Sequence, residues 1–157
     1  MSKVSVIIPA KNEEFLGNTI QSILDASQGE VQIVAVLDAW TPDLPLHFLE
    51  DNVQFLHFKD GIGQREAINQ GVSYCDGDYI LKTDAHSILS PGFDTALTSL
   101  CEDDMTIIPR MINLHAFDWV CNDCGATYDN CGTPDICKKC KGNHFTRSLV
   151  WTPKWHK

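Results

Sequence analysis

Short apolar runs alternate with amphipathic segments over the first 110 residues, and this alternation is the feature that most constrains the fold. The run at 4–8 is wholly apolar except for Ser5 and ends at Pro9, as expected for a buried parallel strand. We predict strands at 4–8, 31–37, 53–58, 79–83 and 105–109, with helices opening at 12–14 and spanning 42–51, 61–74 and 91–100. This order predicts an α/β fold in three layers, with helices on both faces of a mostly parallel sheet.

Length and composition favour one domain with a small appendage. The 157 residues are 43% hydrophobic, which suffices for a packed core. Composition changes near Met111, so we place a main domain at 1–112 and an appended segment at 113–157. No apolar run reaches the length of a membrane span and the amino terminus lacks a signal-peptide pattern, so we expect a cytoplasmic protein.

The charge is unevenly distributed along the chain. Residues 1–110 carry 6 basic and 17 acidic side chains, a net −11, whereas 111–157 carry 6 basic and 4 acidic ones, a net +2. An acidic main domain argues against nonspecific nucleic-acid binding, although the mildly basic tail leaves room for a local polyanion contact.

Five of the seven cysteines fall between 121 and 140. Four of them form two C-x2-C pairs separated by twelve residues, namely Cys121 with Cys124 and Cys137 with Cys140. Four thiolates in this pattern predict a structural zinc ribbon, and the alternative of two disulfides is disfavoured because nothing indicates secretion. Cys131 is expected to be a bystander that can replace a neighbouring ligand, and Cys75 and Cys101 are expected to be buried apolar side chains.

The segment Asp84-Ala85-His86 follows the predicted strand at 79–83. Residues i and i+2 of an extended chain point the same way, so Asp84 and His86 are predicted to share one cation at the carboxyl edge of the sheet. Ligands of open α/β sheets bind at that edge. An aspartate and an imidazole, with phosphate oxygens filling other positions, suit Mn²⁺ or Mg²⁺.

Three stretches together resemble family 2 glycosyltransferases, which have the GT-A fold: residues 4–13, the strand ending at Asp38, and residues 63–71 followed by 76–84. The Asp-x-His form at 84–86 is also similar to that of polypeptide N-acetylgalactosaminyltransferases. The resemblance covers residues 4–100 and implies a sugar-nucleotide donor with its diphosphate on the metal. Inversion is the default of the first family, whereas the Asp-x-His motif leans toward retention, so the stereochemistry stays open.

The resemblance also implies roles for residues near the predicted metal. Pro9, Ala10 and Asn12 lie on the loop that holds the nucleoside in such enzymes, with a plain strand-to-helix turn as the alternative. Glu13 is expected either to reach the nucleoside or to favour a helix dipole. Asp38 is expected to recognise a uracil-type base, with a capping acid as the alternative.

Other residues are candidates to bind the diphosphate, to act as the catalytic base or to supply a third metal ligand. Arg65 is expected to pair with diphosphate oxygens, or else to form a salt bridge with Glu66 or Asp60. Asp118 is the best-placed carboxylate for a catalytic base, although a structural acid is the stronger reading, and no third metal ligand stands out among His115, His144 and His156.

The sequence therefore predicts a glycosyltransferase domain that moves a sugar from a UDP-sugar-like donor to an acceptor hydroxyl. The acceptor is left open as glycan, protein, lipid or nucleic acid, and we expect a partner or downstream segment to supply the acceptor half. A catalytically incomplete nucleotide-binding module, whose ribbon engages nucleic acid or a protein, is the alternative. A nucleotidyltransferase is less well supported because no Gly-rich basic loop follows the first strand.

Overall fold

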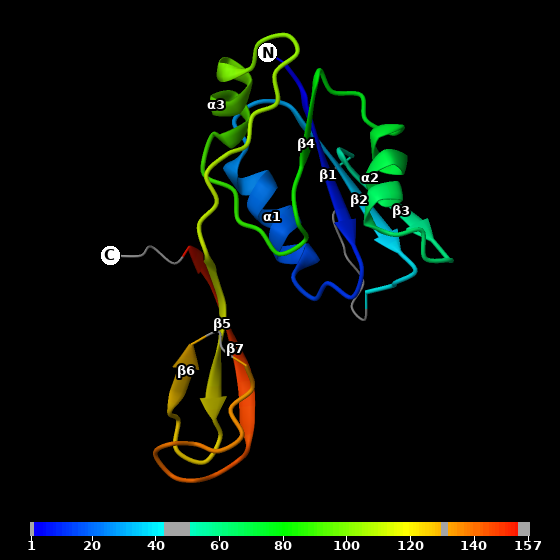
Figure 1. The fold of residues 1–157 in the computed structure, drawn as a ribbon. Helices are drawn as coiled ribbons and strands as arrows, with labels where there is room; N and C mark the ends of the chain where they lie inside the picture. The colour runs from blue at the N-terminus through cyan, green and yellow to red at the C-terminus, as the bar shows by residue number, and fades with distance from the viewer. Residues whose placement is uncertain (1, 43–50, 130–131, 154–157) are drawn as a thin grey trace. The chain divides into compact units, whose positions relative to one another are not determined.

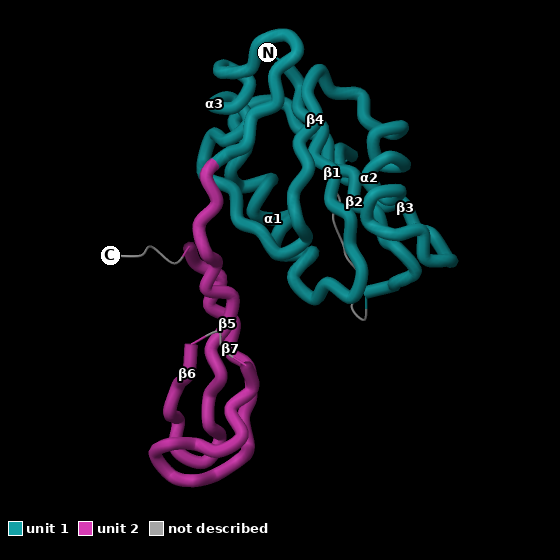
Figure 2. The backbone as a smooth tube through the Cα atoms, viewed as in Figure 1, with its two compact units in different colours: residues 1–109 teal, residues 110–157 magenta. Residues whose placement is uncertain are grey.

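The structure is a computed structural model that describes residues 2–42, 51–129 and 132–153. It contains two compact units, residues 1–109 and residues 110–157, against a predicted boundary after residue 112. Figure 2 distinguishes the two units by colour, and each is described here by itself.

Unit 1 contains a four-stranded parallel sheet in the order β3-β2-β1-β4 (Figure 1). Its strands are β1 (Val4–Ala10), β2 (Val31–Asp38), β3 (Val53–Phe58) and β4 (Tyr79–Lys82). Strand β1 continues through Pro9. A proline is tolerated at this position because β4 pairs with β1 only as far as Ile7. The proline, which has no N–H to donate, therefore lies beyond the end of the β1–β4 ladder.

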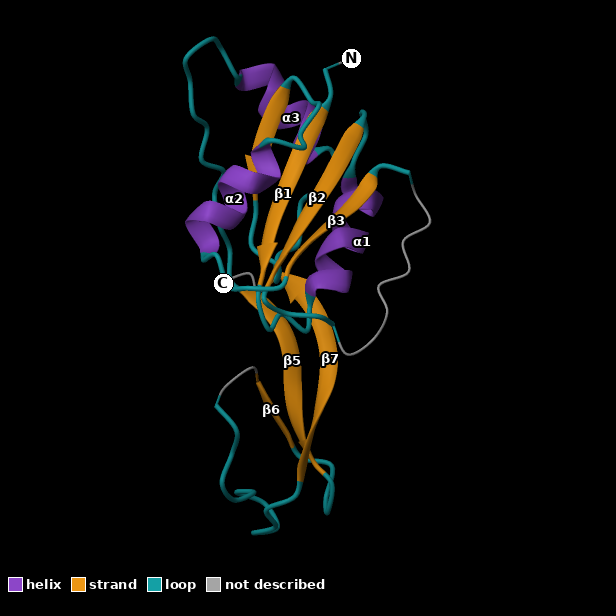
Figure 3. Ribbon diagram, turned by 90° about the vertical axis from the view of Figure 1, so that its right-hand side faces the viewer, coloured by secondary structure: helices purple, strands orange, loops and turns teal. Residues whose placement is uncertain are grey.

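Helices cover both faces of this sheet, with α1 on one side and α2 on the other (Figure 3). The side chains of α1 (Leu16–Ala26) and of Phe93 at the start of α3 (Phe93–Leu100) join the even-numbered apolar residues of β1 in one core cluster. Helix α2 (Gln64–Val72) packs through Ala67 against Ile7 and the even-numbered valines of β2 in a second cluster. The period-two alternation of the strands thus divides the core between the two faces, and the predicted three-layer α/β fold is confirmed.

A buried polar cluster ties the amino end of β4 to the sheet. Ser5 Oγ donates to Gln32 Oε1 at 2.6 Å, and Gln32 Oε1 also accepts from the backbone N–H of Asp76 at 3.0 Å. Gln32 Nε2 donates to the carbonyl of Tyr74 at 2.9 Å, and Gly77 N donates to Ser5 Oγ at 2.9 Å. These bonds satisfy polar groups that would be costly to bury alone, and they fasten the turn between α2 and β4.

Unit 2 contains a three-stranded antiparallel sheet in the order β6-β5-β7. Its strands are β5 (Leu114–Cys121), β6 (Thr127–Asp129) and β7 (Phe145–Pro153). The pairing of β5 with β7 changes register between His115 and Phe117.

Some local predictions were wrong. Residues 105–109 form no strand, and Met105 and Ile108 are largely exposed, because an apolar run without a hydrogen-bonded neighbour does not become a strand. Helix α1 begins at Leu16 rather than at 12–14, and it has no side-chain cap and no acid in its first turn. The helix expected at 42–51 falls largely outside the described residues. Cys75 and Cys101 are half-buried rather than fully buried.

Candidate functional site

The residues that directly follow β1, β2 and β4 lie at the carboxyl edge of the sheet, since all four strands are parallel. Asp38, the last residue of β2, is 4% exposed. Its two carboxylate oxygens accept from the backbone N–H groups of Ile62 at 2.6 Å and Gly63 at 3.1 Å. Lys11 Nζ lies 3.9 Å from the same carboxylate. Asp38 therefore holds the loop that leads into α2, and its role in recognising a base stays a prediction.

Asp84 and His86 lie just beyond β4, which ends at Lys82, one residue earlier than predicted. The segment is not extended, because a turn occupies Ala85 and His86, so the alternation argument for these two residues was wrong. Ala85 is 1% exposed and belongs to the core, which leaves Asp84 and His86 as the outward members of the segment. Asp84 forms an ion pair with Lys82.

His86 pairs with a different residue. Its Nδ1 atom lies 3.1 Å from Oε2 of Glu13, which comes from the loop after β1. Glu13 precedes α1, which has no acid in its first turn, and both roles predicted for Glu13 stay predictions. Among the described residues, Glu13, Asp84 and His86 do not gather into a cluster of three close ligand atoms.

The other residues predicted to bind the donor lie around the same edge. Pro9 and Ala10 end β1, with Ala10 buried, and Asn12 has a φ of 56°, a left-handed conformation that asparagine tolerates better than most residues. Arg65 is exposed in the first turn of α2. The salt bridge weighed between Arg65 and Glu66 or Asp60 is not formed, and Glu66 instead accepts from Gln70 at 2.7 Å. Nucleotide contacts by these residues stay predictions.

The four cysteines of the two C-x2-C pairs converge in unit 2, with all Sγ atoms within 4.8 Å of one another. Cys121 Sγ lies 3.6 Å from Cys140 Sγ, and Cys124 Sγ lies 3.6 Å from Cys137 Sγ. These separations far exceed a disulfide bond of about 2.05 Å. They approach the separation of about 3.8 Å between sulfurs around a tetrahedral zinc with Zn–S bonds of about 2.3 Å.

A tyrosine that sequence reasoning did not single out supports this cluster. Tyr128 donates its hydroxyl proton to Cys137 Sγ at 3.3 Å and accepts from the backbone N–H of Lys138 at 2.8 Å. The Tyr128 hydroxyl, followed by the backbone N–H of Cys140, lowers the pKa of Cys137 to about 6. The protein thus favours a thiolate, the form of cysteine that binds metal.

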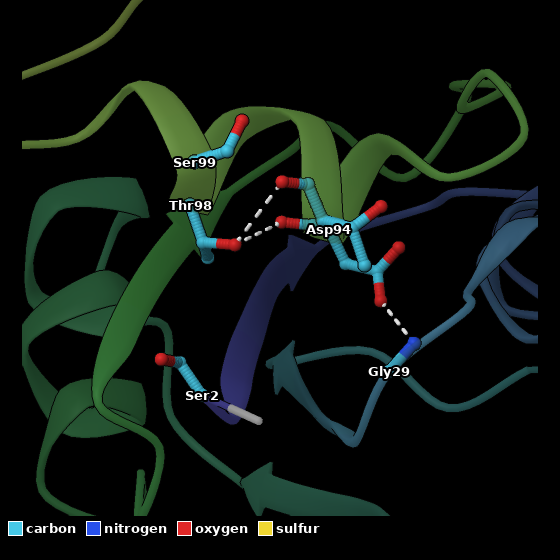
Figure 4. A pocket seen from close by; sticks show the side chains of 6 residues that line it. Ser2, Gly29, Asp94, Thr98 and Ser99 are labelled. Atoms are coloured by element: carbon cyan, nitrogen blue, oxygen red, sulfur yellow. Dashed lines mark hydrogen bonds between the residues drawn. The ribbon is translucent and has the colours of Figure 1, made fainter.

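Two pockets lie at the opposite, amino edge of the sheet. One has a volume of about 250 Å³ and is lined by Ser2, Gly29, Asp94, Thr95, Thr98 and Ser99 (Figure 4). The other has a volume of about 410 Å³ and includes Lys3, Glu30 and Asn52 in its walls. Ligands of open α/β sheets bind at the carboxyl edge, so neither pocket coincides with the predicted site.

The carboxylate that lines the first pocket has a structural function. Asp94 is 3% exposed and accepts from Gly29 N at 2.6 Å and Gln28 N at 3.1 Å. Burial raises the pKa of Asp94, but the backbone N–H groups of Gly29, Gln28 and Thr95 outweigh it and hold the pKa below the ordinary value of 3.8. These bonds join the start of α3 to the turn after α1.

Asp118 and His115, both considered earlier for the donor site, belong to unit 2 and contact each other. His115 Nε2 lies 2.7 Å from Asp118 Oδ1. Asp129 joins them to form a second group of close ligand atoms. This group could not be predicted from the sequence, because the three residues share no motif. His144 is exposed, with Nδ1 3.8 Å from Asp123, and His156 lies outside the described residues.

A parallel sheet with helices on both faces and polar residues at its carboxyl edge defines an α/β domain of the kind that binds ligands at strand ends. The chain belongs to glycosyl transferase family 2, whose family model matches residues 5–113. The predicted family is thereby confirmed.

The chain is also similar in sequence and in structure to other proteins. An uncharacterized glycosyltransferase from Haemophilus influenzae is 26% identical over 144 residues, which cover 86% of this chain and 43% of that protein. The crystal structure of S. aureus TarS superposes with a TM-score of 0.54 at 20% identity, covering 62% of this chain and 19% of TarS. The crystal structure of TarS residues 1–349 superposes with a TM-score of 0.51 at 16% identity, covering 73% of this chain and 41% of that one. These likenesses support the predicted GT-A fold.

The chain spans less than half the length of these relatives. No helix within residues 2–42, 51–129 and 132–153 combines the length and the apolar character needed to cross a bilayer.

Proposed function

We propose that the chain is the donor-binding part of a glycosyltransferase that takes a sugar from a nucleoside-diphosphate sugar, UDP-linked in the first instance, and passes it to an acceptor hydroxyl. The observation that carries this proposal is the match of residues 5–113 to family 2. At one edge of the sheet, Asp38 ends β2, Glu13 follows β1, and Asp84 and His86 follow β4.

The pairing of His86 with Glu13 supports a metal site there. Histidines that bind metals commonly donate the second ring N–H to a carboxylate, which fixes the tautomer and leaves the other nitrogen for the ion. With Glu13 accepting from Nδ1 of His86, Nε2 is the nitrogen available to a cation. The imidazole is 55% exposed, so this nitrogen can be reached from solvent.

Asp84 would supply the second protein ligand once its carboxylate is released from Lys82. Two protein ligands suit Mn²⁺ or Mg²⁺, because such ions usually keep several positions for water and for the phosphates of the substrate. When bound, the ion supplies charge stabilisation to the departing nucleoside diphosphate.

The remaining roles belong to the side chains themselves. Lys82, freed from Asp84, and Arg65 bring positive charge toward the diphosphate from β4 and α2. Asp38 orders the loop before α2 through Ile62 and Gly63, and its remaining lone pairs can accept from a base N–H. Ala10 and Asn12 place backbone beside the nucleoside.

The test is the binding of UDP to the full chain with and without Mn²⁺, measured by calorimetry, together with the hydrolysis of UDP-sugars. We expect binding that requires Mn²⁺ and is lost in Asp84→Asn and His86→Ala. Asp25→Asn is the matched control, since Asp25 is an exposed acid on α1 hydrogen-bonded to Gln21. Metal-independent binding, or binding that both site variants retain, contradicts the proposal.

We also propose that the four clustered cysteines hold a structural zinc ion. The separations of 3.6 Å between sulfurs and the thiolate-favouring contact from Tyr128 support it. A site with four protein ligands has no open position for chemistry, so this ion would hold unit 2 folded. Metal analysis of the purified chain tests this, with zinc expected in the parent and one equivalent less expected for Cys121→Ser combined with Cys137→Ser.

The second candidate is a nucleotide-binding module without turnover. The ion pair of Asp84 with Lys82 favours it, since that carboxylate is occupied. Tight, Mn²⁺-dependent UDP binding without donor hydrolysis or transfer, also in a longer form of the protein, would favour the module over the enzyme.

A further inference from the structure

We propose that His115, Asp118 and Asp129 form a second divalent-metal site, located wholly within unit 2 and separate from the four cysteines. One nitrogen or oxygen atom from each residue lies within 4.8 Å of the others. The inference does not depend on the proposed function, because no residue of unit 1 takes part.

The sheet is irregular where His115 contacts Asp118. Residues three apart on a regular strand point to opposite faces. The register of β5 with β7 shifts between His115 and Phe117, and such bulges increase the local twist. His115 Nε2 and Asp118 Oδ1 come within 2.7 Å across this irregular stretch.

The pairing of β5 with β6 places Asp129 next to Asp118. Asp118 and Asp129 are direct partners in the antiparallel pairing of β5 with β6. Like charges directly opposite each other on neighbouring strands are destabilising. A divalent cation between the two carboxylates would turn that repulsion into attraction.

The spacing suits a small transition-metal ion. With bonds of about 2.1 Å, neighbouring ligand atoms lie about 3.0 Å apart in octahedral and about 3.4 Å apart in tetrahedral geometry, and opposite ones about 4.2 Å apart. The 2.7 Å separation of His115 from Asp118 needs only a small opening to reach these values.

The ligand set indicates which ion binds. One imidazole and two carboxylates favour Zn²⁺, Co²⁺ or Ni²⁺ over Ca²⁺, which prefers oxygen alone. The side chains of His115 and Asp118 are 18% and 24% exposed, whereas Asp129 is exposed. Three protein ligands with one exposed side leave at least one position for water or a substrate oxygen, in contrast to the cysteine site.

The experiment uses the full chain already carrying one zinc, with Asp84→Asn and His86→Ala introduced so that the proposed donor site cannot bind metal. Titration with Co²⁺ is followed by calorimetry and visible absorption. We expect one further equivalent to bind without the thiolate-to-cobalt charge-transfer band of a cysteine site. Affinity should fall at least about tenfold in His115→Ala, Asp118→Asn and Asp129→Asn.

His144→Ala is the matched control, since it removes an exposed histidine of the same unit, and it should bind as the parent does. Zinc content and circular dichroism report whether each variant is folded. A second measurement uses the chain with all three proposed ligands intact, so it does not depend on whether a variant folds. In that chain, bound Co²⁺ should broaden NMR signals of β5 and β6 around His115 and Asp129. Absence of the extra equivalent, unchanged affinity in folded Asp118→Asn, or broadening elsewhere overturns the proposal.

Discussion

The imidazole of His86 and the carboxylate of Glu13 lie 3.1 Å apart, although 73 residues separate them in sequence. The contact joins the loop after β1 to the turn after β4, two neighbouring strands of the sheet. If His86 binds the proposed cation, Glu13 has the position of an outer carboxylate that orients the imidazole.

Replacing Glu13 by glutamine should weaken Mn²⁺-dependent UDP binding by about 10- to 100-fold, because the imidazole loses the charged acceptor that fixes its tautomer. Calorimetry with UDP and Mn²⁺ measures the change. Glu14→Gln removes the adjacent, exposed carboxylate and should bind as the parent does. Equal affinities for the two variants would show that Glu13 does not act through His86.

Replacing Asp38 by alanine should lower the free energy of unfolding by about 1–3 kcal/mol, since the backbone N–H groups of Ile62 and Gly63 lose their acceptor. Asp38→Asn keeps one oxygen and should cost less. Urea denaturation followed by circular dichroism measures both. If the two variants are equally stable, the hydrogen bonds to the loop before α2 contribute little.

Asp94 should make the stability of unit 1 depend on pH in the acid range. Its pKa in the folded protein is lowered, so its stabilisation is present above the unfolded value of about 3.9 and is lost as the pH falls through the folded pKa. Asp94→Asn should therefore show a smaller loss of stability between neutral pH and about pH 3. Asp25→Asn, on the exposed side of α1, should keep the parent's dependence, and an unchanged slope in Asp94→Asn would refute the assignment.

Removal of zinc with a strong chelator should unfold unit 2 while the strands of unit 1 keep their protection, because each unit is compact by itself. Hydrogen exchange of the backbone amides, measured separately for the strands of unit 1 and of unit 2, shows which unit loses protection. Cys137→Ser should mimic the chelator, whereas Cys101→Ser, a half-buried cysteine of unit 1, should not. Loss of protection in both units at once would contradict this independence.

The fold was largely predictable because β1 and β2 are mostly apolar and buried almost throughout, and because α1 has one apolar stripe. The 105–109 segment was not, since an apolar run carries no information on whether a neighbouring strand exists. The cysteine cluster was predictable from its spacing. The contacts of Glu13 with His86 and of Asp118 with Asp129 were not, because they depend on strand order and register, which single-sequence patterns do not encode.

The bonds from Gln32 and Ser5 to the turn at Asp76 and Gly77 have a consequence at the far end of β4. That strand has only four residues, and slipping it by one position would exchange its inward and outward side chains. Ala85 would then leave the core and an acid or an imidazole would enter it. The hydrogen bonds at the amino end of β4 therefore also fix the orientation of Asp84 and His86 beyond its carboxyl end. Weakening these bonds should redirect the two side chains, although neither residue takes part in them.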